Sequence, residues 1–178
     1  MNNLPFGVTL RDLAPHRDDR GVFTELFREE WADDDAPPFI QWNAVSSETG
    51  VLRGVHVHLV HHDYLTLVAG SAVIGLADLR DDSETFMQAT CVDLSAAHPQ
   101  ALGIPPGVAH GFYFPEPATH VYAVSEYWDL ADELGCRWDD PQLAIPWPQK
   151  SVRLSERDAE LPPVAELLEQ LAATRAQT

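Results

Sequence analysis

Short apolar segments that alternate with turn-forming clusters are the feature that most constrains the fold of this chain. The clusters between them, such as SETG at 47–50, RDDSET at 80–85 and PPG at 105–107, are strong breakers of regular structure. Many short strands at nearly regular spacing, with no helix between them, predict an antiparallel all-β barrel or jelly roll. The predicted strands are FIQWNAVSS (39–47), VLRGVHVHLV (51–60), DYLTLVAGSAVIGLADL (63–79), QATCVDL (88–94), ALGIP (101–105), HGFYF (110–114) and THVYAVSEYW (119–128).

Two segments are predicted to be helical. They are FTELFREEW at 23–31 and the tail PPVAELLEQLAATRAQT at 162–178, in which apolar residues recur at helical spacing. We expect the tail, from about residue 160 onward, to pack on the outside of the barrel or to fray, and we assign it no chemistry. A chain of 178 residues is long enough for one well-buried core, so we expect a single domain over residues 1–178.

The charge and hydropathy of the chain exclude several classes of partner. The formal net charge of −17 argues against nucleic acid and against anionic membranes. Every apolar run is shorter than a membrane span, and the N-terminal MNNLPFGVTL lacks a signal-peptide pattern. We therefore expect a cytoplasmic protein, with Cys91 and Cys136 as inert thiols. A small anionic ligand stays compatible with this charge, because a few arginines can bind phosphate oxygens locally.

Half of the eight histidines of the chain lie in GVHVHLVHHD at 54–63. Strand alternation places His56 and His58 on one face with Gly54, opposite a valine face that we expect to be core. Arg53 has the parity of the valines, where a charge is costly, unless Gly54 marks a bulge that re-aims the chain. The direction of the Arg53 side chain therefore depends on Gly54.

A metal centre is one interpretation of this segment. H-x-H-x4-D is followed later by the histidine of PPGVAHGF, and the pattern resembles the two-part metal motif of the cupins. Such a set suits zinc, iron or manganese with positions open for water or substrate. The alternative is that these are polar residues lining a wet barrel mouth. His61 and His62, which are adjacent and point oppositely, are expected to be incidental. The candidate ligands are His56, His58, Asp63 and His110.

A second set of motifs is scattered along the chain. In order they are DDRGVFTELF, FIQWNAVSS, GVLRGVH, DLRDDSETF, IPPGVAHGF, VYAVSEYW, WDDPQLAIPWP and LSERD, from about Asp18 to Asp158. Together they resemble the dTDP-4-dehydrorhamnose 3,5-epimerase family of nucleotide-sugar enzymes. The resemblance implies a cupin-type jelly roll, a homodimer, a nucleotide-sugar substrate, and an activity that needs no metal or organic cofactor.

The resemblance also implies roles for individual residues. His56 of LRGVH is the general base, Asp158 of LSERD orients it, and Tyr122 of VYAVSEYW is the acid on the opposite face of the sugar. Trp128 stands where the family places an aromatic that stacks on thymine. The remaining residues implied to line the nucleotide-sugar site are Arg20, Glu25, Gln41, Asn43, Arg53, His110, Glu133 and Arg157.

The chemistry of a 4-keto sugar fits these roles. Its C3–H and C5–H bonds flank the carbonyl and are acidic, so inversion needs a base on one face, an acid on the other, and stabilisation of the enolate. Histidine suits the base because its pKa lies near neutrality, and a carboxylate partner fixes its tautomer. We therefore expect epimerisation at C3, C5 or both of a nucleotide-linked 4-keto-6-deoxy sugar, in deoxysugar biosynthesis.

The chain departs from the family at two positions beside His56. The lysine that stabilises the enolate in the family corresponds to Asp63, and a glutamine-like position corresponds to His58. Either another donor such as His110 replaces the lysine, or a divalent metal does so as a Lewis acid. A ligated His56 has no free lone pair for proton abstraction, so we favour the metal-free enzyme. The alternatives are a metal-dependent cupin (a dioxygenase or isomerase) and a non-catalytic sugar-nucleotide binding module.

Overall fold

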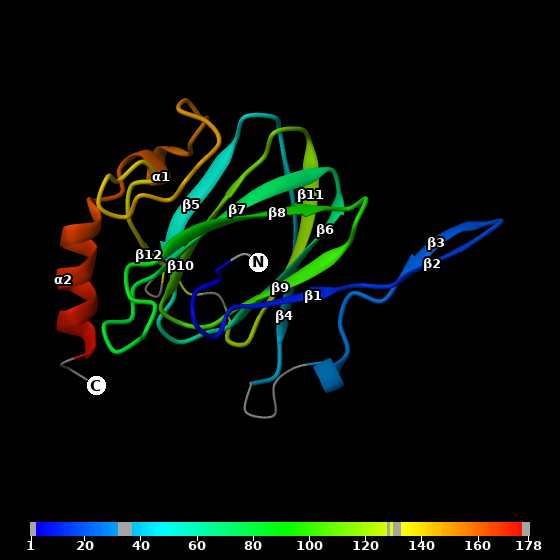
Figure 1. Cartoon of the computed structure of the whole chain (residues 1–178), viewed down its shortest axis with the longest axis horizontal. Coiled ribbons are helices and arrows are strands. Elements are labelled where there is room, and N and C mark those ends of the chain that lie inside the picture. Colours follow the sequence, from blue (N-terminus) through cyan, green and yellow to red (C-terminus); the bar gives the residue numbers. More distant parts are fainter. Residues whose placement is uncertain (1–2, 32–36, 128, 130–132, 176–178) are drawn as a thin grey trace.

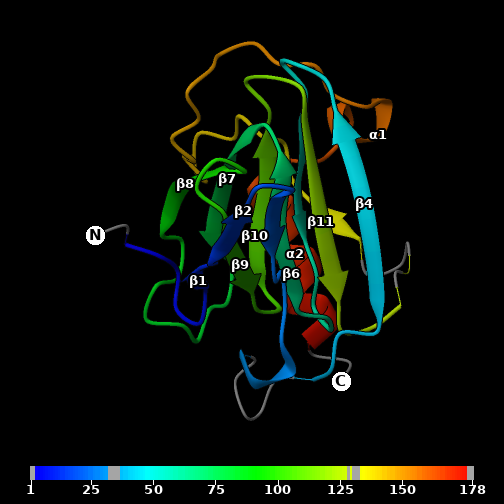
Figure 2. The same ribbon diagram turned by 90° about the vertical axis from the view of Figure 1, so that its right-hand side faces the viewer.

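The computed structural model describes residues 3–31, 37–127, 129 and 133–175. Its strands form two five-stranded antiparallel sheets that face each other, in the orders β1-β9-β6-β11-β4 and β12-β5-β10-β7-β8 (Figures 1 and 2). The strands are β1 (Thr9–Asp12), β2 (Pro15–Asp18), β3 (Gly21–Thr24), β4 (Gln41–Ser47), β5 (Leu52–Val57), β6 (Asp63–Ala69), β7 (Ser71–Asp78), β8 (Ala89–Ser95), β9 (Gln100–Ile104), β10 (Val108–Tyr113), β11 (Ala118–Val124) and β12 (Leu134–Gly135). The predicted all-β jelly roll is confirmed.

The predicted helix at 23–31 is wrong. Residues Gly21–Thr24 form β3, which pairs with β2 in a hairpin that projects from the barrel (Figure 1), and only Glu29–Trp31 forms one turn of 3-10 helix, η1. The helical spacing of apolar residues in this segment does not produce a helix, because these residues pack against another part of the chain. Phe27 and Trp31 pack against a small cluster around Tyr64 instead of forming the stripe of a helix.

The space between the two sheets is filled by aliphatic side chains from both of them. Leu65 of β6 and Leu102 of β9 meet Ile74 and Leu76 of β7, and all four are at most 1% exposed. Alternation along each strand sends these residues inward and their neighbours outward. This cluster fills one part of the barrel interior and leaves another part to polar side chains.

The C-terminal tail forms α2 (Val164–Arg175), which packs against the outer face of the second sheet (Figure 1). Val164 and Leu167 of this helix join a buried cluster with Val55 and Val57 of β5. The predicted position of the tail on the outside of the barrel is confirmed, and the valine face of β5 is core as expected. Since β5 buries its valines under α2, its other face points into the barrel.

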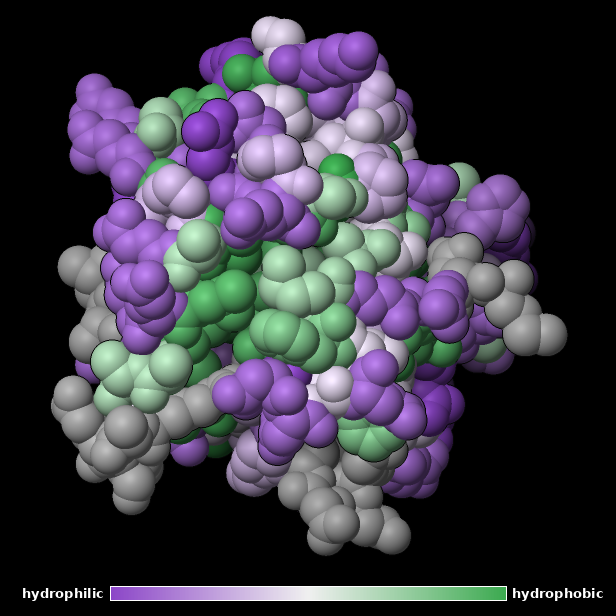
Figure 3. All heavy atoms as spheres, turned by 60° about the vertical axis from the view of Figure 1, so that its left-hand side comes forward, coloured by the Kyte–Doolittle hydropathy of each residue, from purple (hydrophilic) through white to green (hydrophobic). Residues whose placement is uncertain are grey.

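The face that carries α2 has hydrophobic side chains gathered near its centre, surrounded by hydrophilic ones (Figure 3). A second, very short helix, α1 (Glu156–Ala159), precedes α2. In the described part of the chain, no helix is both long and apolar enough to cross a membrane.

The contact between α2 and β5 makes a testable prediction about stability. Leu167→Ala is expected to lower the free energy of unfolding by about 2–5 kcal/mol, because it removes a fully buried side chain and leaves a cavity. Urea unfolding measures the change. Gln170→Ala, an exposed position on the same helix, is the control and should change stability by less than about 0.5 kcal/mol. Equal losses in the two variants would contradict the packing described here.

Candidate active site

A bulge at Gly54 lets the side chains of Arg53 and His56, both on β5, point toward the barrel interior. The pairing of β5 with β10 joins His56 to His110 and Arg53 to Phe112, with a shift of register between the two pairs. Gly54 has φ +102°, and a Cβ atom there would lie 2.8 Å from the carbonyl oxygen of His110. The bulge that the sequence left open at Gly54 is therefore present. It brings Arg53 and His56 to the same cavity although their sequence parity differs.

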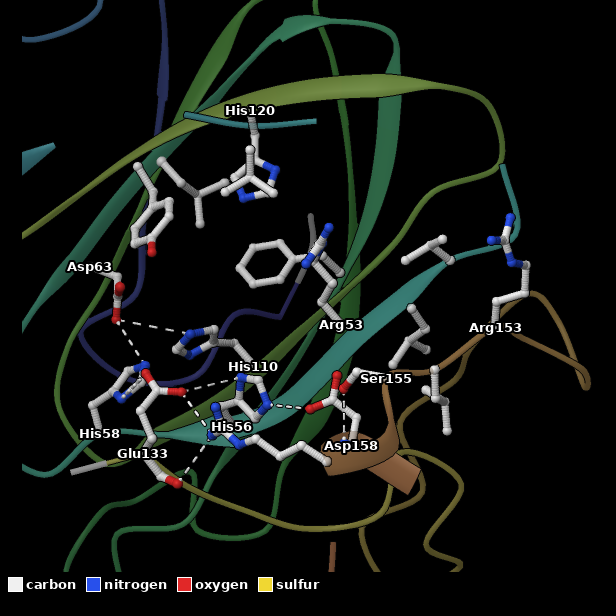
Figure 4. A pocket seen from close by; sticks show the side chains of 18 residues that line it. Arg53, His56, His58, Asp63, His110, His120, Glu133, Arg153, Ser155 and Asp158 are labelled. Carbon is white, nitrogen blue, oxygen red and sulfur yellow. Dashed lines mark hydrogen bonds and ion pairs between the residues drawn. The ribbon is translucent and has the colours of Figure 1, made fainter. Parts of the chain in front are cut away.

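The cavity has a volume of about 440 Å³ and lies inside the barrel. Its walls come from both sheets and from the segment that leads into α1, as Figure 4 shows. The polar side chains that line it are Arg53, His56, His58, Asp63, His110, His120, Tyr122, Glu133, Arg153, Ser155, Arg157 and Asp158.

His56 and Asp158 form a hydrogen-bonded pair in this cavity, with 2.7 Å between His56 Nε2 and Asp158 Oδ1 (Figure 4). Burial raises the pKa of Asp158. Hydrogen bonds from His56, from the Gly54 N–H and from Ser155 lower it by more than burial raises it, so the pKa of Asp158 is below its ordinary value. The ionised carboxylate only accepts, so His56 Nε2 donates. In the neutral imidazole the free lone pair is then on Nδ1.

Tyr122 lies on β11, in the sheet opposite to that of His56, so the two side chains enter the cavity from opposite walls. Its pKa is raised by burial and, to a smaller extent, by the negative charges of Asp63 and Glu133. The phenol therefore keeps its proton at neutral pH. The structure thus brings together the predicted base, its orienting carboxylate and the predicted acid.

Glu133 connects several groups of the same wall. Its carboxylate pairs with Arg157 at 2.9 Å, while its oxygens lie 3.8 Å from His56 Nδ1 and 3.6 Å from His58 Nδ1. Glu133 is partly buried, and its side chain is 9% exposed. Glu133 therefore lines the cavity beside the predicted base.

Four of the predicted substrate-binding residues do not line this cavity. The side chain of Arg20 is 85% exposed on the projecting hairpin and pairs with Asp18, and Glu25 pairs with Arg28. Gln41 and Asn43 lie on the edge strand β4, where the Gln41 amide donates to the Asn43 side chain. Trp128 lies outside the described residues.

Sequence reasoning missed three polar cavity residues. Arg153 directly precedes LSERD and Ser155 is its second residue, so the extent of that motif was the available signal. Backbone hydrogen bonds join Arg153 to Gly50 and Leu52, which fixes this segment beside β5. His120 shares its strand face with Tyr122 by alternation, and this shared parity was the available signal.

His120 is 4% exposed and is stacked against the rings of Phe112 and Phe114. Burial, followed by the charge of Arg53, lowers the pKa of His120 to about 4. An imidazole in this position is therefore neutral at physiological pH.

A second polar group lies next to the pair of His56 and Asp158. The atoms of His58, His61 and Asp63 that could bind a metal ion all lie within 4.8 Å of one another, and all three residues are buried. His61 is 3% exposed and stacks on His58 with 3.9 Å between ring centroids, so the expectation that His61 is incidental is wrong. His56, which the sequence placed among the metal ligands, is instead held by Asp158.

His110 faces the same group. Its Nδ1 lies 3.2 Å from the carbonyl oxygen of Val108, which can only accept, so Nδ1 carries the proton. Burial and the nearby His58 lower the pKa of His110 to about 3, despite smaller opposing contributions. Nε2 therefore carries a lone pair and cannot donate to an enolate oxygen, contrary to the expectation for His110.

A family model described as dTDP-4-dehydrorhamnose 3,5-epimerase matches residues 5–166. The chain belongs to this family. A dTDP-4-dehydrorhamnose 3,5-epimerase of Shigella flexneri is 34% identical over 148 residues, which cover 79% of this chain and 82% of the relative. The family resemblance predicted from the motifs is confirmed.

Solved structures of the epimerase family superpose over most of the chain. The 3,5-epimerase of Legionella pneumophila, in complex with dTDP-4-keto-L-rhamnose, has a TM-score of 0.86 and 31% identity, and covers 94% of this chain and 95% of its own. ChmJ, a 3'-monoepimerase of Streptomyces bikiniensis in complex with dTDP-quinovose, has a TM-score of 0.87 and 30% identity, covering 97% and 91%. Both double and single epimerases thus share this fold.

The burial of His120 predicts how the stability of this epimerase depends on pH. The folded pKa of about 4 lies below the unfolded value near 6.5, so between these values the unfolded state binds more protons and stability falls as pH falls. His120→Gln is expected to remove about 2 kcal/mol of the stability loss between pH 7 and pH 5. Urea unfolding at both pH values measures this.

The control is His98→Gln. His98 is exposed and lies between β8 and β9, so this variant should leave the pH dependence of stability unchanged. If wild type and His120→Gln lose the same stability between pH 7 and pH 5, His120 is not the neutral, buried imidazole described here.

Proposed function

We propose that this chain epimerises a nucleotide-linked 4-keto-6-deoxy sugar, of the dTDP-4-dehydro-6-deoxyglucose type, at C3, C5 or both. The observation that carries the proposal is the pair of His56 with Asp158 on one wall of a cavity and Tyr122 on the opposite wall. Membership of the epimerase family supports the same conclusion. The metal-dependent oxygenase that the sequence left open has no such support.

Proton abstraction is the first step. His56 uses the Nδ1 lone pair to take the proton from the carbon next to the carbonyl, because Nε2 is engaged with Asp158. The electrons of the C–H bond move to the carbonyl oxygen and form an enolate. The ionised Asp158 stabilises the positive imidazolium that results, which lowers the energy of the intermediate.

Proton return from the other face completes the inversion. Tyr122 donates its phenolic proton to the same carbon, and the enolate returns to the ketone. The tyrosinate is then reprotonated from solvent, and the His56 imidazolium releases its proton to solvent. The raised pKa of Tyr122 keeps the acid form available at neutral pH. Net inversion follows because the base and the acid act from opposite walls.

The charge of the cavity supports an anionic substrate. Arg53, Arg153 and Arg157 line it, although the chain as a whole has a net charge of −17. Guanidinium groups suit diphosphate oxygens, and binding a diphosphate remote from the reacting carbons positions the sugar. We therefore propose that these arginines bind the diphosphate of the nucleotide sugar.

Deuterium exchange tests the two proton-transfer roles separately. In deuterated buffer the wild type should place deuterium at C3 or C5 of dTDP-4-dehydro-6-deoxyglucose, and His56→Ala should slow this by about 10²–10⁴-fold. Tyr122→Phe should retain exchange at the carbon that faces His56 but lose inversion, because His56 returns the proton to the same face. Mass spectrometry and NMR distinguish the two outcomes.

Gln170→Ala, an exposed change on α2, is the control for this assay and should keep both activities. Tight binding of the nucleotide sugar with no exchange in the folded wild type would instead favour the non-catalytic binding module. Neither binding nor exchange with any nucleotide 4-keto sugar would exclude both functions.

We also propose that the enzyme is a cytoplasmic homodimer. The hairpin that carries Arg20 projects away from the barrel, so a role for Arg20 in substrate binding requires the cavity of a second chain. Exposed apolar residues on the hairpin and at the open edge of the first sheet support an interface there, since Phe23 is 63% exposed and Trp42 is 44% exposed.

Complementation tests this dimer. Arg20→Ala and His56→Ala homodimers should each be impaired, whereas a mixed dimer should recover one competent cavity that combines His56 of one chain with Arg20 of the other. Activity of co-purified mixed dimers, compared with equal amounts of the separate variants, is the measurement. A monomer in light scattering, or no recovery in a confirmed mixed dimer, would contradict the proposal.

A further inference from the structure

The buried group beside the catalytic pair has the geometry of a cation site. Nε2 atoms of three histidines surround one oxygen of Asp63, Oδ2, at 3.7 Å for His61 and 3.9 Å for both His58 and His110. These separations are too long for hydrogen bonds. Two ligands that each lie about 2.1 Å from one tetrahedral zinc ion are about 3.4 Å apart. The candidate ligand atoms of His58, His61 and Asp63 lie within 4.8 Å of one another, so modest side-chain movements bring these three residues to one ion.

The outward nitrogen of one of these imidazoles is held by a hydrogen bond, as a metal ligand requires, and that of a second faces a carboxylate. Nδ1 of His110 donates to the carbonyl oxygen of Val108, and Nδ1 of His58 faces the Glu133 carboxylate at 3.6 Å. In metal sites the second nitrogen of a ligating histidine donates to a carbonyl or carboxylate, which leaves a lone pair toward the ion. The Nε2 lone pair of His110 faces Asp63 Oδ2 at 3.9 Å, and both atoms would attract a cation placed between them.

The group does not include His56. His56 Nε2 is hydrogen-bonded to Asp158, whereas the close group consists of residues at the end of β5 and the start of β6. The sequence-based ligand set placed metal binding and proton abstraction in conflict, since it used His56 for both. In the structure, His61 takes the place of His56 in the set of candidate ligands. His56 then stays available as a catalytic base while an ion is bound.

We propose that His58, His61 and Asp63, with His110 as a fourth donor, bind a divalent transition-metal ion of the zinc type. Imidazole-rich sets select zinc, cobalt and nickel over magnesium and calcium, which prefer oxygen ligands. Asp63 lines the substrate cavity, so the ion changes a negative point of the cavity wall into a positive one. The proposal rests on these contacts and not on the proposed function.

Cobalt titration of tag-free, chelator-stripped protein tests the site directly. One Co²⁺ per chain should bind with a visible absorption band of four- or five-coordinate cobalt, and Zn²⁺ should displace it. At a hundredfold excess over the dissociation constant, Zn²⁺ should raise Tm by about 5–11 °C, whereas Mg²⁺ should leave it unchanged.

Paired variants separate the site from a general effect of histidine content. His61→Asn and Asp63→Asn should each weaken Co²⁺ binding by about tenfold or more, whereas His62→Asn, the neighbouring histidine outside the group, should bind as the wild type does. Circular dichroism confirms that the variants are folded, and if the Asp63 variant does not fold, His61→Asn alone decides the outcome.

Three results would overturn the proposal: fewer than one ion per folded chain, equal weakening by His62→Asn, or comparable binding of Mg²⁺. The titration uses no substrate, and the deuterium-exchange assay is run with chelator as well as with Zn²⁺. Failure of metal binding therefore leaves the epimerase proposal intact, and loss of exchange leaves the metal site intact.

Discussion

The packing of β5 between α2 and the barrel interior fixes the direction of the His56 side chain. Val55 and Val57 are completely buried under α2, so a shift of β5 by one residue would place valines in the cavity and imidazoles under the helix. The bulge at Gly54 then adds Arg53 to the inner face. The base, its carboxylate partner and one of the cationic residues of the cavity all depend on this single strand.

The fold was largely predictable because strands that are half-buried reveal themselves by alternation and by the breakers between them. The segment at 23–31 was mispredicted because local spacing does not show that Phe27 and Trp31 pack beside Tyr64. The hairpin that replaces the predicted helix is a consequence of pairing between β2 and β3, which periodicity alone does not encode.

The site was predictable only in part. Asp158 could be paired with His56 across 102 positions only through the order of family motifs, since no local pattern links them. His61 was dismissed because two adjacent residues on a strand point in opposite directions. The structure shows that β5 ends at Val57, so His61 lies in a connection whose backbone turns the ring onto His58. Alternation does not apply where the strand has ended.

The acidic residues of the cavity differ in the partners that surround their carboxylates. Asp158 is stabilised as a carboxylate by three hydrogen-bond donors, and Glu133 is neutralised by Arg157. Asp63 is surrounded instead by imidazoles. It also occupies the position where the resemblance implies a lysine, so the sign of the charge at this point of the cavity wall is opposite to the one that the family pattern implies.

The separation of the two members of the catalytic pair has a consequence for biosynthesis. The strand that carries His56 is made early, whereas Asp158 belongs to α1, which is joined to the barrel through hydrogen bonds of the segment around Arg153. During translation the chain emerges from its N-terminal side, so the barrel can begin to form before the carboxylate exists. A nascent chain that ends before residue 158 therefore lacks the carboxylate that orients His56.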